Sequence, residues 1–383
     1  MRIILIGNYP PDSQDSMRLF SLMLQNGFVK AGIDSEIWLP KVFFGRFSKV
    51  TNKGLGKWLG YLDKWVFYPV ILKMKLSDKQ YNNPNVRFHI CDHSNSPYLA
   101  YLPTEKSGLT CHDVLAIRGA FGFEDAYCKT SGLGLLLQKW ILKNILKVDR
   151  LAAVSGLTLH QLNELNNGLE NKTKDWRVIH NSFNESFIPL PAHVAQLKIA
   201  EMGLSRDVPF LLHLGSSLER KNRKLLVDML VELGEAWKGI VCFAGDAIDP
   251  DLGGYIQKLG LQNRVVSIIK PSHENVVALY SACEAFIFPS FSEGFGWPLI
   301  EAQACGAPVI ASNIEPMPEV SGGAALHESP YKAADFAKAF LSLDKISVRE
   351  QLIAEGFENC KRFSSEKMIG EYLSLYNFQK QVT

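Results

Sequence analysis

Residues 284–312 read Glu-Ala-Phe-Ile-Phe-Pro-Ser-Phe-Ser-Glu-Gly-Phe-Gly-Trp-Pro-Leu-Ile-Glu-Ala-Gln-Ala-Cys-Gly-Ala-Pro-Val-Ile-Ala-Ser. The apolar run at the start of this stretch is typical of a buried strand in a parallel sheet. Residues 298–306 are typical of a short helix, with Pro298 at its first position and Gly306 at its C-terminal cap. The apolar run at 307–312 predicts the next strand. The stretch is therefore a βαβ unit, and it predicts an α/β fold built on a parallel sheet.

Two carboxylates, Glu293 and Glu301, stand eight positions apart around the strand-to-helix loop of this unit. Such loops lie at the carboxyl edge of a parallel sheet, where open α/β folds bind ligands. The helix start offers unpaired N–H groups that suit a phosphate, and the carboxylates can accept hydrogen bonds from sugar hydroxyls. The loop therefore predicts a ligand in which a sugar is joined to a phosphate. Each Glu taken singly has a plainer explanation, because acidic residues near a helix start suit the helix dipole.

The stretch resembles the E-x7-E signature of retaining glycosyltransferases with the GT-B fold, and it is most similar to family 4. The resemblance implies that Glu301 binds the ribose of a nucleotide. It also implies that Glu293 holds the donor sugar as a catalytic residue, and that the donor diphosphate is bound by the amides of Gly294, Phe295, Gly296 and Trp297.

Hydrophobic patterning along the chain predicts two doubly wound domains, as in the GT-B fold that the resemblance implies. The first, residues 1–184, is expected to be the acceptor-side domain, and it has strand patterns at 2–7, 35–39, 87–91, 108–111, 151–154 and 176–180. A polar, Pro-bearing stretch at 181–191 predicts the linker. The second domain, 185–365, is expected to bind the nucleotide-sugar. The resemblance implies that a last helix, within 366–383, crosses back onto the first domain.

Composition is that of a globular protein, with 383 residues, 47% hydrophobic residues, 21% charged residues and a net charge of +2. The near-neutral charge argues against a nucleic-acid partner. Seven cysteines without a Cys-x-x-Cys motif favour a reducing compartment. The first residues, 1–7, predict a strand and not a signal peptide, and no apolar stretch has the length of a membrane span. We therefore expect a cytoplasmic protein.

A second candidate site follows the strand at 209–215. Arg220 and Lys221 are expected to clamp the donor diphosphate, Arg as a planar fork and Lys as a point charge. The plainer alternative is an exposed basic helix start. Many members of the family carry Arg directly after the glycine, where this chain has Ser216, and Arg220 is a candidate to compensate.

His112 follows a strand of the first domain and resembles the family's histidine that contacts the donor sugar near the reacting carbon. The resemblance also places the nucleobase against the loop that contains Lys270 and Pro271. Ser272 in this loop has a simpler alternative role as the N-cap of a helix, with Asn275 at its third position.

His89, Cys91 and His93 alternate, so a strand would place them on one face, as in a metal site. No fourth ligand is evident, and a structural role is the preferred interpretation. The resemblance likewise implies no required metal, and no cofactor is expected.

Residues 41–79 carry nine Lys or Arg against two Asp or Glu, interleaved with aromatic residues. Two interpretations stay open. The segment is either an amphipathic helical insertion packed on the first domain or a surface for peripheral contact with an anionic membrane.

The predicted function is that of a retaining glycosyltransferase of polysaccharide biosynthesis of the bacterial type, which moves a hexose from a nucleotide-sugar to a glycan or lipid-linked acceptor. UDP-sugars such as UDP-glucose are favoured on family frequency. The alternatives are a GDP-mannose-dependent mannosyltransferase, a nucleotide-sugar epimerase and an inactive nucleotide-sugar-binding protein.

Overall fold

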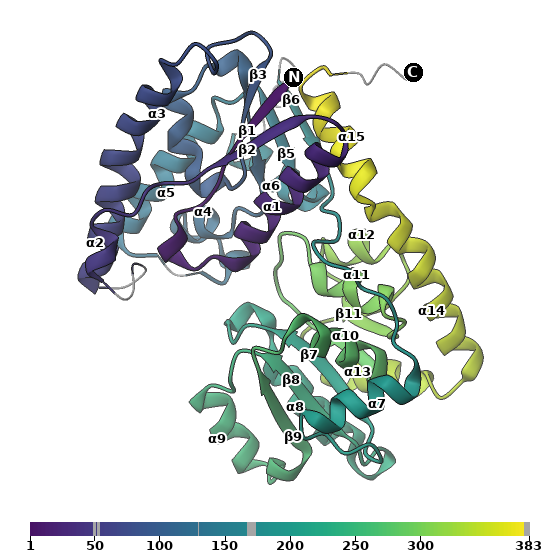
Figure 1. Ribbon diagram of the computed structural model, residues 1–383. Coiled ribbons are helices and arrows are strands. Elements are labelled where there is room, and N and C mark those ends of the chain that lie inside the picture. Colours follow the sequence, from purple (N-terminus) through teal and green to yellow (C-terminus); the bar gives the residue numbers. More distant parts are fainter. Residues whose placement is uncertain (49–50, 52–53, 129, 167–173, 379–383) are drawn as a thin grey trace. The chain divides into compact units, whose positions relative to one another are not determined.

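The computed structural model contains two compact units, each built on one parallel sheet (Figure 1). The structure describes residues 1–48, 51, 54–128, 130–166 and 174–378. Unit 1 comprises residues 1–123, 128–184 and the C-terminal segment from Ser365, and unit 2 comprises 185–364 with the short segment 124–127. The residues of the predicted linker that follow β6 form no helix or strand. The last part of the predicted C-terminal helix, 379–383, lies outside the described residues.

Unit 1 has six parallel strands in the order β2-β1-β3-β4-β5-β6. All six were predicted from the sequence, and their bounds agree with the prediction to within two residues. They are β1 (Arg2–Ile6), β2 (Asp34–Trp38), β3 (Val86–Ile90), β4 (Ser107–Cys111), β5 (Arg150–Ala153) and β6 (Asp175–Val178). The strand order reverses between β1 and β3, which is the position where doubly wound sheets bind ligands.

The helices of unit 1 cover its sheet on both faces. One face forms a buried core with α3 and α5, through residues such as Ile4, Phe88, Leu72 and Ile145. The helices are α1 (Asp15–Lys30), α2 (Gly54–Leu62), α3 (Tyr68–Leu76), α4 (Leu115–Ala120), α5 (Gly132–Ile145), α6 (Gly156–Leu165) and α15 (Ser365–Leu375).

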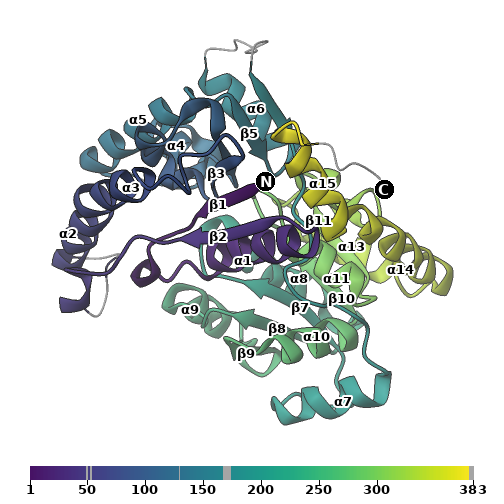
Figure 2. The same cartoon turned by 45° about the horizontal axis from the view of Figure 1, so that its top comes forward.

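The C-terminal helix α15 packs beside α1, and Figure 2 shows the two together. Buried hydroxyl groups fix it to the sheet. Tyr376 Oη lies 2.7 Å from His89 Nδ1, and Tyr372 Oη lies 2.7 Å from the hydroxyl of Thr110. His89 Nε2 is also occupied, at 2.8 Å from Thr110 Oγ1. Both ring nitrogens of His89 therefore have hydrogen-bond partners inside unit 1, which gives this histidine a structural role. His93 does not continue the strand, as a one-face metal site would need, because it starts a 3-10 turn at 93–101.

The predicted insertion at 41–79 is helical at 45–47 and over 54–76. The π-helical turn η3 (Asp63–Phe67) joins α2 to α3. Buried Asp63 fixes this segment, because its carboxylate accepts hydrogen bonds from the Tyr9 hydroxyl and from the backbone N–H groups of residues 43–45. Residues 49–50 and 52–53 of the insertion lie outside the described residues.

Unit 2 repeats the architecture with the order β12-β11-β10-β7-β8-β9, again all parallel. Its strands are β7 (Phe210–Gly215), β8 (Ile240–Gly245), β9 (Val265–Ile269), β10 (Ala285–Phe288), β11 (Val309–Ser312) and β12 (Leu326–Glu328). The sequence did not predict β12, a short and half-buried edge strand. The strand order reverses between β7 and β10, so the loops that follow these two strands meet at one edge of the sheet.

The helices of unit 2 include three, α7, α9 and α12, that the sequence did not predict. They are α7 (Ala192–Glu201), α8 (Arg223–Leu233), α9 (Pro250–Lys258), α10 (His273–Ala282), α11 (Trp297–Ala304), α12 (Met317–Ser321), α13 (Ala333–Ser342) and α14 (Ile346–Cys360). All seven cysteines are free thiols. Among the described residues, no helix combines the length and the apolar character that a membrane crossing requires.

Candidate donor site

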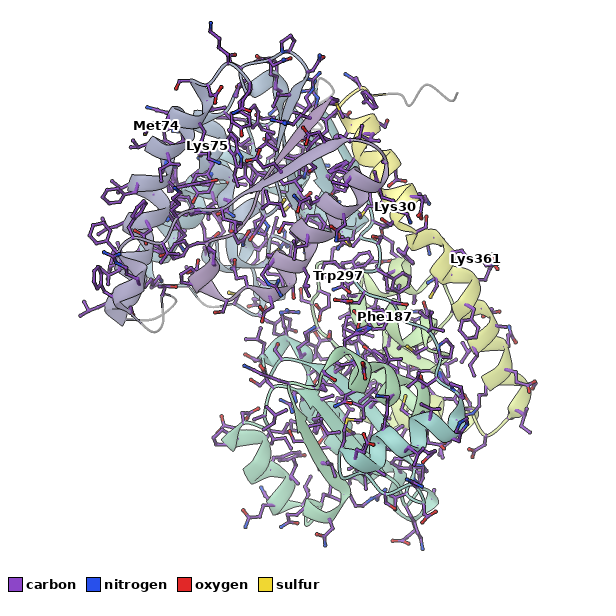
Figure 3. The ribbon with its side chains drawn as sticks, viewed as in Figure 1. Lys30, Met74, Lys75, Phe187, Trp297 and Lys361 are labelled. Atoms are coloured by element: carbon purple, nitrogen blue, oxygen red, sulfur yellow. The ribbon has the colours of Figure 1, made fainter. Side chains whose placement is uncertain are left out.

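The loop between β10 and α11 has the backbone geometry that its glycines predict. Gly296 caps the start of α11 with a φ of +99°, and a Cβ at this position would lie 3.2 Å from Leu299 Cδ1. A larger residue would therefore strain the turn. The helix begins at Trp297, labelled in Figure 3, one residue before the predicted start. Glu301 consequently lies in the second turn of α11. A helix that began at Pro298, as the sequence predicted, would have placed it in the first turn.

Three charged side chains from the two loops at the switch point of unit 2 form one cluster. Glu293 Oε2 lies 2.7 Å from Arg220 Nη1, and Glu293 Oε1 lies 2.6 Å from Lys221 Nζ. Backbone bonds hold the loops together, because Phe291 N–H donates to the carbonyl of Arg220. Lys221 Nζ also lies 5.0 Å from the centre of the Phe288 ring, within the range of a cation–π contact. Residues separated by more than 70 positions in the chain thus meet at one point.

Burial and charge act in opposite directions on this cluster. Burial would raise the pKa of Glu293, but the cations Lys221 and Arg220 outweigh it and lower that pKa. Burial lowers the pKa of Lys221, and attraction to Glu293 opposes this shift. We assign the pair as ionised, since each charge faces its opposite at ion-pair distance. A buried ion pair of this kind is expensive to desolvate and adds little to stability.

Glu301 stands in a different environment. It is 8% exposed, and its Oε2 accepts a hydrogen bond from the Tyr280 hydroxyl at 3.1 Å. Burial raises the pKa of Glu301 to about 7, while Tyr280 and Lys221 oppose the rise. Tyr280, on α10, was not identified from the sequence, because a tyrosine inside an apolar helix face gives no sign of its hydroxyl partner.

The remaining predicted residues of unit 2 lie on the same edge of the sheet. Half-buried Ser216 directly follows β7. Lys270 and Pro271 follow β9, and the Lys270 N–H donates to the carbonyl of Gly245 at the end of β8. The N-cap role of Ser272 is confirmed, because its hydroxyl accepts from the Asn275 N–H.

His112 belongs to unit 1 and directly follows β4. Its Nε2 lies 2.8 Å from the carbonyl oxygen of Cys91, and its ring meets Phe20 edge-on at 4.4 Å between centroids. A carbonyl can only accept, so Nε2 carries the proton. Burial lowers the pKa of His112, although Asp92 opposes the shift. The imidazole is therefore neutral near pH 7, with the lone pair on Nδ1.

No group of three or more His, Cys, Asp or Glu side chains in the described part of the chain has the arrangement of a metal site.

Comparison with known proteins identifies the family of unit 2. Residues 196–358 match the model of the family "Glycosyl transferases group 1". Over 104 residues the chain is 40% identical to the O-antigen chain mannosyltransferase B of Escherichia coli, which is 27% of each protein. Over 95 residues it is 36% identical to a D-inositol 3-phosphate glycosyltransferase of Mycolicibacterium vanbaalenii, which is 24% of this chain and 21% of that protein. The chain thus matches about a quarter of the length of these curated relatives.

The likeness to solved structures extends over the whole fold. A sucrose-phosphate synthase from Thermosynechococcus elongatus superposes with a TM-score of 0.75 at 20% identity, covering 98% of both chains. Anabaena HepE, solved in complex with UDP and glucose, superposes with a TM-score of 0.70 at 15% identity, covering 98% of this chain and 99% of that one. The chain therefore carries a domain of the glycosyl transferases group 1 family, that is family 4, within the GT-B fold, as the Glu293 and Glu301 signature indicated.

Proposed function

We propose that the protein is a retaining glycosyltransferase, which moves a hexose from a nucleotide-sugar to a glycan or lipid-linked acceptor in polysaccharide biosynthesis. The observation that carries the proposal is the cluster of Arg220, Lys221 and Glu293 at the switch point of unit 2. It supplies two cations and a carboxylate at the edge of the sheet where this class of fold binds ligands. Membership of unit 2 in the glycosyl transferases group 1 family supports the same assignment.

The cluster is suited to a diphosphate because its cations are already assembled. Glu293 pairs with both Lys221 and Arg220, and the cluster keeps a net positive charge. A diphosphate competes for these cations and frees the Glu293 carboxylate to accept hydrogen bonds from sugar hydroxyls. The amides of residues 294–297 and the start of α11 add N–H donors.

The same groups explain how the reaction is accelerated. The bond between the anomeric carbon and the diphosphate oxygen breaks, and negative charge grows on the leaving phosphate. Preorganised cations and N–H groups bind this growing charge more strongly than the ground state. The acceptor hydroxyl attacks the anomeric carbon, and an oxygen of the leaving phosphate takes its proton. In this scheme Lys221 and Arg220 perform the role of a metal, so we propose that none is required.

We assign the nucleoside to Glu301, Lys270 and Pro271. Hydroxyls of the ribose donate to the carboxylate of Glu301, and the base lies against the loop after β9. We assign neutral His112 to the donor sugar, where Nδ1 accepts a hydroxyl hydrogen bond. These roles follow the family resemblance, and variants of Glu301 and His112 test two of them.

The donor sugar has two candidates. UDP-glucose is the donor predicted from family frequency. A mannosyl donor, with GDP-mannose as its nucleotide-sugar, is favoured by the 40% identity to a mannosyltransferase over 104 residues.

Release of free nucleotide tests the proposal. The purified protein is incubated with UDP-glucose or GDP-mannose, with and without a mannose-containing oligosaccharide acceptor. We expect release from one donor only when acceptor is present. A donor that is converted to its epimer without acceptor would indicate an epimerase, and nucleotide binding without turnover of either donor would indicate a binding protein.

A second proposal concerns the outer face of α2 and α3. We propose that this face touches an anionic membrane surface, with the protein on the cytoplasmic side. Six apolar side chains recur every three or four residues along it, and each is at least 41% exposed: Leu55, Trp58, Leu62, Val66, Val70 and Met74. Lys57 and Lys73 lie on the same helices, and Figure 3 shows Met74 on α3. Exposed apolar stripes with adjacent cations suit a membrane surface.

Co-sedimentation with phosphatidylglycerol vesicles tests this surface. We expect the wild type to pellet with these vesicles but not with phosphatidylcholine vesicles. The double variant Leu55→Ser with Val70→Ser should lose binding, and Leu197→Ser, an exposed apolar residue on α7, should keep it. Equal binding by the double variant would refute the assignment.

A further inference from the structure

Asn222 directly follows the donor-site pair Arg220 and Lys221, and its backbone is left-handed, with a φ of +51°. It ends the 3-10 turn η7 (Glu219–Lys221) and is the N-cap residue of α8. An asparagine at an N-cap position usually accepts a hydrogen bond from an N–H group of the first helical turn. The side chain of Asn222 makes no such bond, so its orientation has another cause.

The side-chain amide of Asn222 joins three loops at the carboxyl edge of the unit 2 sheet. Its Nδ2 donates to the carbonyl of Pro289 at 3.1 Å and to the carbonyl of Pro330 at 2.7 Å. Pro289 directly follows β10, Pro330 lies between β12 and α13, and Asn222 itself lies between β7 and α8. The NH₂ group has two hydrogens, so both are used. The amide therefore attaches the β10–α11 loop and the β12–α13 loop to the β7–α8 loop.

The contacts of Arg220 complete this attachment on the other side of Lys221. The carbonyl of Arg220 accepts from the Phe291 N–H at 2.8 Å, and Arg220 Nη1 donates to the carbonyl of Ser292 at 3.0 Å. Lys221 thus lies between two residues that are both bonded to the β10–α11 loop. The last of these bonds lies one residue before Glu293. The attachment therefore holds the Lys221 ammonium beside the Glu293 carboxylate, where Nζ and Oε1 are 2.6 Å apart.

The cluster needs such an attachment, because some of its charges oppose assembly. Burial lowers the pKa of Lys221 and so does the adjacent cation Arg220, while the carboxylates of Glu293 and Glu301 oppose them. A ligand that had to bring these groups together would lose part of its binding free energy. Two hydrogen bonds from Asn222, each worth a factor of about 2–10, favour the assembled loops before a ligand arrives.

We propose that Asn222 is a positioning residue of the donor site, which holds the β10–α11 loop against Lys221 so that a diphosphate meets cations that are already in place. The anchoring of the loop stands by itself, and its consequence for the diphosphate rests on the proposed function. Asn222 contacts no phosphate in this role. It acts through Lys221 and Glu293, so its removal should weaken the binding of the diphosphate group more than that of the nucleoside.

Two variants remove the amide donors of Asn222. Asn222→Gly keeps the backbone conformation, because glycine adopts a positive φ readily. Asn222→Asp keeps the shape of the side chain and tolerates the same conformation, but its carboxylate cannot donate to the two carbonyl oxygens. It takes the place of Asn222→Gly if that variant does not fold. Asn377→Gly is the matched control, because Asn377 is an exposed residue of unit 1 with a φ of +56°.

Amide hydrogen exchange of the ligand-free protein tests the anchoring. The peptide 289–296 contains the Phe291 N–H that donates to Arg220, and it should exchange about tenfold faster in Asn222→Gly than in the wild type. The amides of the buried strand β8 should exchange at the wild-type rate, and so should the peptide 289–296 in Asn377→Gly. Unchanged exchange of this peptide in the folded Asn222 variants would overturn the proposal.

Calorimetric titration with UDP and UMP, and with GDP and GMP, tests the consequence for the ligand. For the base that binds, Asn222→Gly should lower the affinity for the diphosphate about tenfold and that for the monophosphate less than about twofold. Asn377→Gly should leave both affinities unchanged. A residue that only stabilises the fold would leave the ratio of the two affinities unchanged in the folded variant, and this result would overturn the proposal.

The outcome is separable from that of the proposed function. If the wild type binds none of the four nucleotides, the proposed function fails, and the assignment of Asn222 to a donor site fails with it even where the exchange result holds. If the wild type binds a diphosphate and the folded Asn222 variants bind it equally well, the positioning role alone is refuted.

Discussion

The switch points of the two sheets carry opposite chemistry. In unit 2, Arg220 and Lys221 enclose Glu293, so the edge holds two cations and one anion. In unit 1, the carboxylate of Asp92 accepts from Asn8 and Ser94. Among the described residues no Lys or Arg pairs with Asp92. A phosphate could replace Glu293 as the partner of cations, but at Asp92 it would meet a carboxylate whose basic neighbour is an imidazole, with His93 Nδ1 3.5 Å from Asp92 Oδ1. A shared topology therefore supplies the position of a site, and the loop residues decide its charge.

Among the variants considered, loss of Lys221 should lower donor turnover most, because it removes a cation from the charged edge of unit 2. In Lys221→Met the diphosphate loses a buried cation and Glu293 loses a partner. We expect kcat/KM for the donor to fall about 10²–10³-fold, as for other preorganised charge-stabilising groups. Steady-state kinetics measure the effect, with Lys198→Met as a control, since this lysine pairs with Glu274 on an exposed surface. If kcat/KM fell by less than about threefold, the change in activation free energy would be only about RT. Lys221 would then not contact the diphosphate.

His112 is the uncharged site residue of unit 1, so its removal should affect turnover and not the binding of the charged nucleotide. We expect His112→Ala to lower kcat about 2–10-fold, the equivalent of one neutral hydrogen bond of about 0.5–1.5 kcal/mol, with nucleotide affinity unchanged. Calorimetric titration of nucleotide beside kinetics separates the two quantities. A loss of nucleotide affinity in step with kcat would place His112 at the nucleotide instead.

Much of this arrangement could be predicted from the sequence, because the strands and the signature loop are each formed by residues that are adjacent in the chain. The strands of both sheets are short apolar runs bounded by Gly, Pro or polar residues, and the signature loop is continuous in the chain. The pairing of Glu293 with Lys221 and the hydrogen bond from the Tyr280 hydroxyl to Glu301 join distant segments, so no local pattern predicts them. The sequence also placed the start of α11 one residue late, because Pro298 is tolerated at the second helical position as well as at the first.

The pKa of Glu301 makes a prediction about stability. Its value of about 7 lies above the ordinary value of 4.5, so the folded protein binds a proton there that the unfolded chain releases. The stabilising contribution is complete below pH 4.5 and is lost as pH rises toward 7 and above. Glu301→Gln removes this loss. We expect the variant to be more stable than wild type at pH 8 by about 3 kcal/mol and to lose most of this advantage at pH 5. Urea unfolding at both pH values is the measurement, and a pH-independent difference would contradict the raised pKa.

The smallest expected effect is that of a variant that adds positive charge to the edge of unit 2. Ser216→Arg adds a cation at the position where many family members have one. A partly exposed charge contributes about 0.2–1 kcal/mol, so binding of the nucleoside diphosphate should tighten a few-fold, with little change for the monophosphate. Equal gains for both nucleotides would show that the new side chain does not reach the outer phosphate.

Thermal unfolding with nucleotides shows whether the edge of unit 2 binds the donor nucleotide. Melting temperatures are measured with and without saturating UDP, GDP or ADP, for the wild type, Glu301→Ala and His112→Ala, each against its own ligand-free value. The account predicts that one nucleotide raises the melting temperature of the wild type and His112→Ala by mass action, and that Glu301→Ala loses the shift. No shift with any nucleotide, or a full shift in Glu301→Ala, would contradict it.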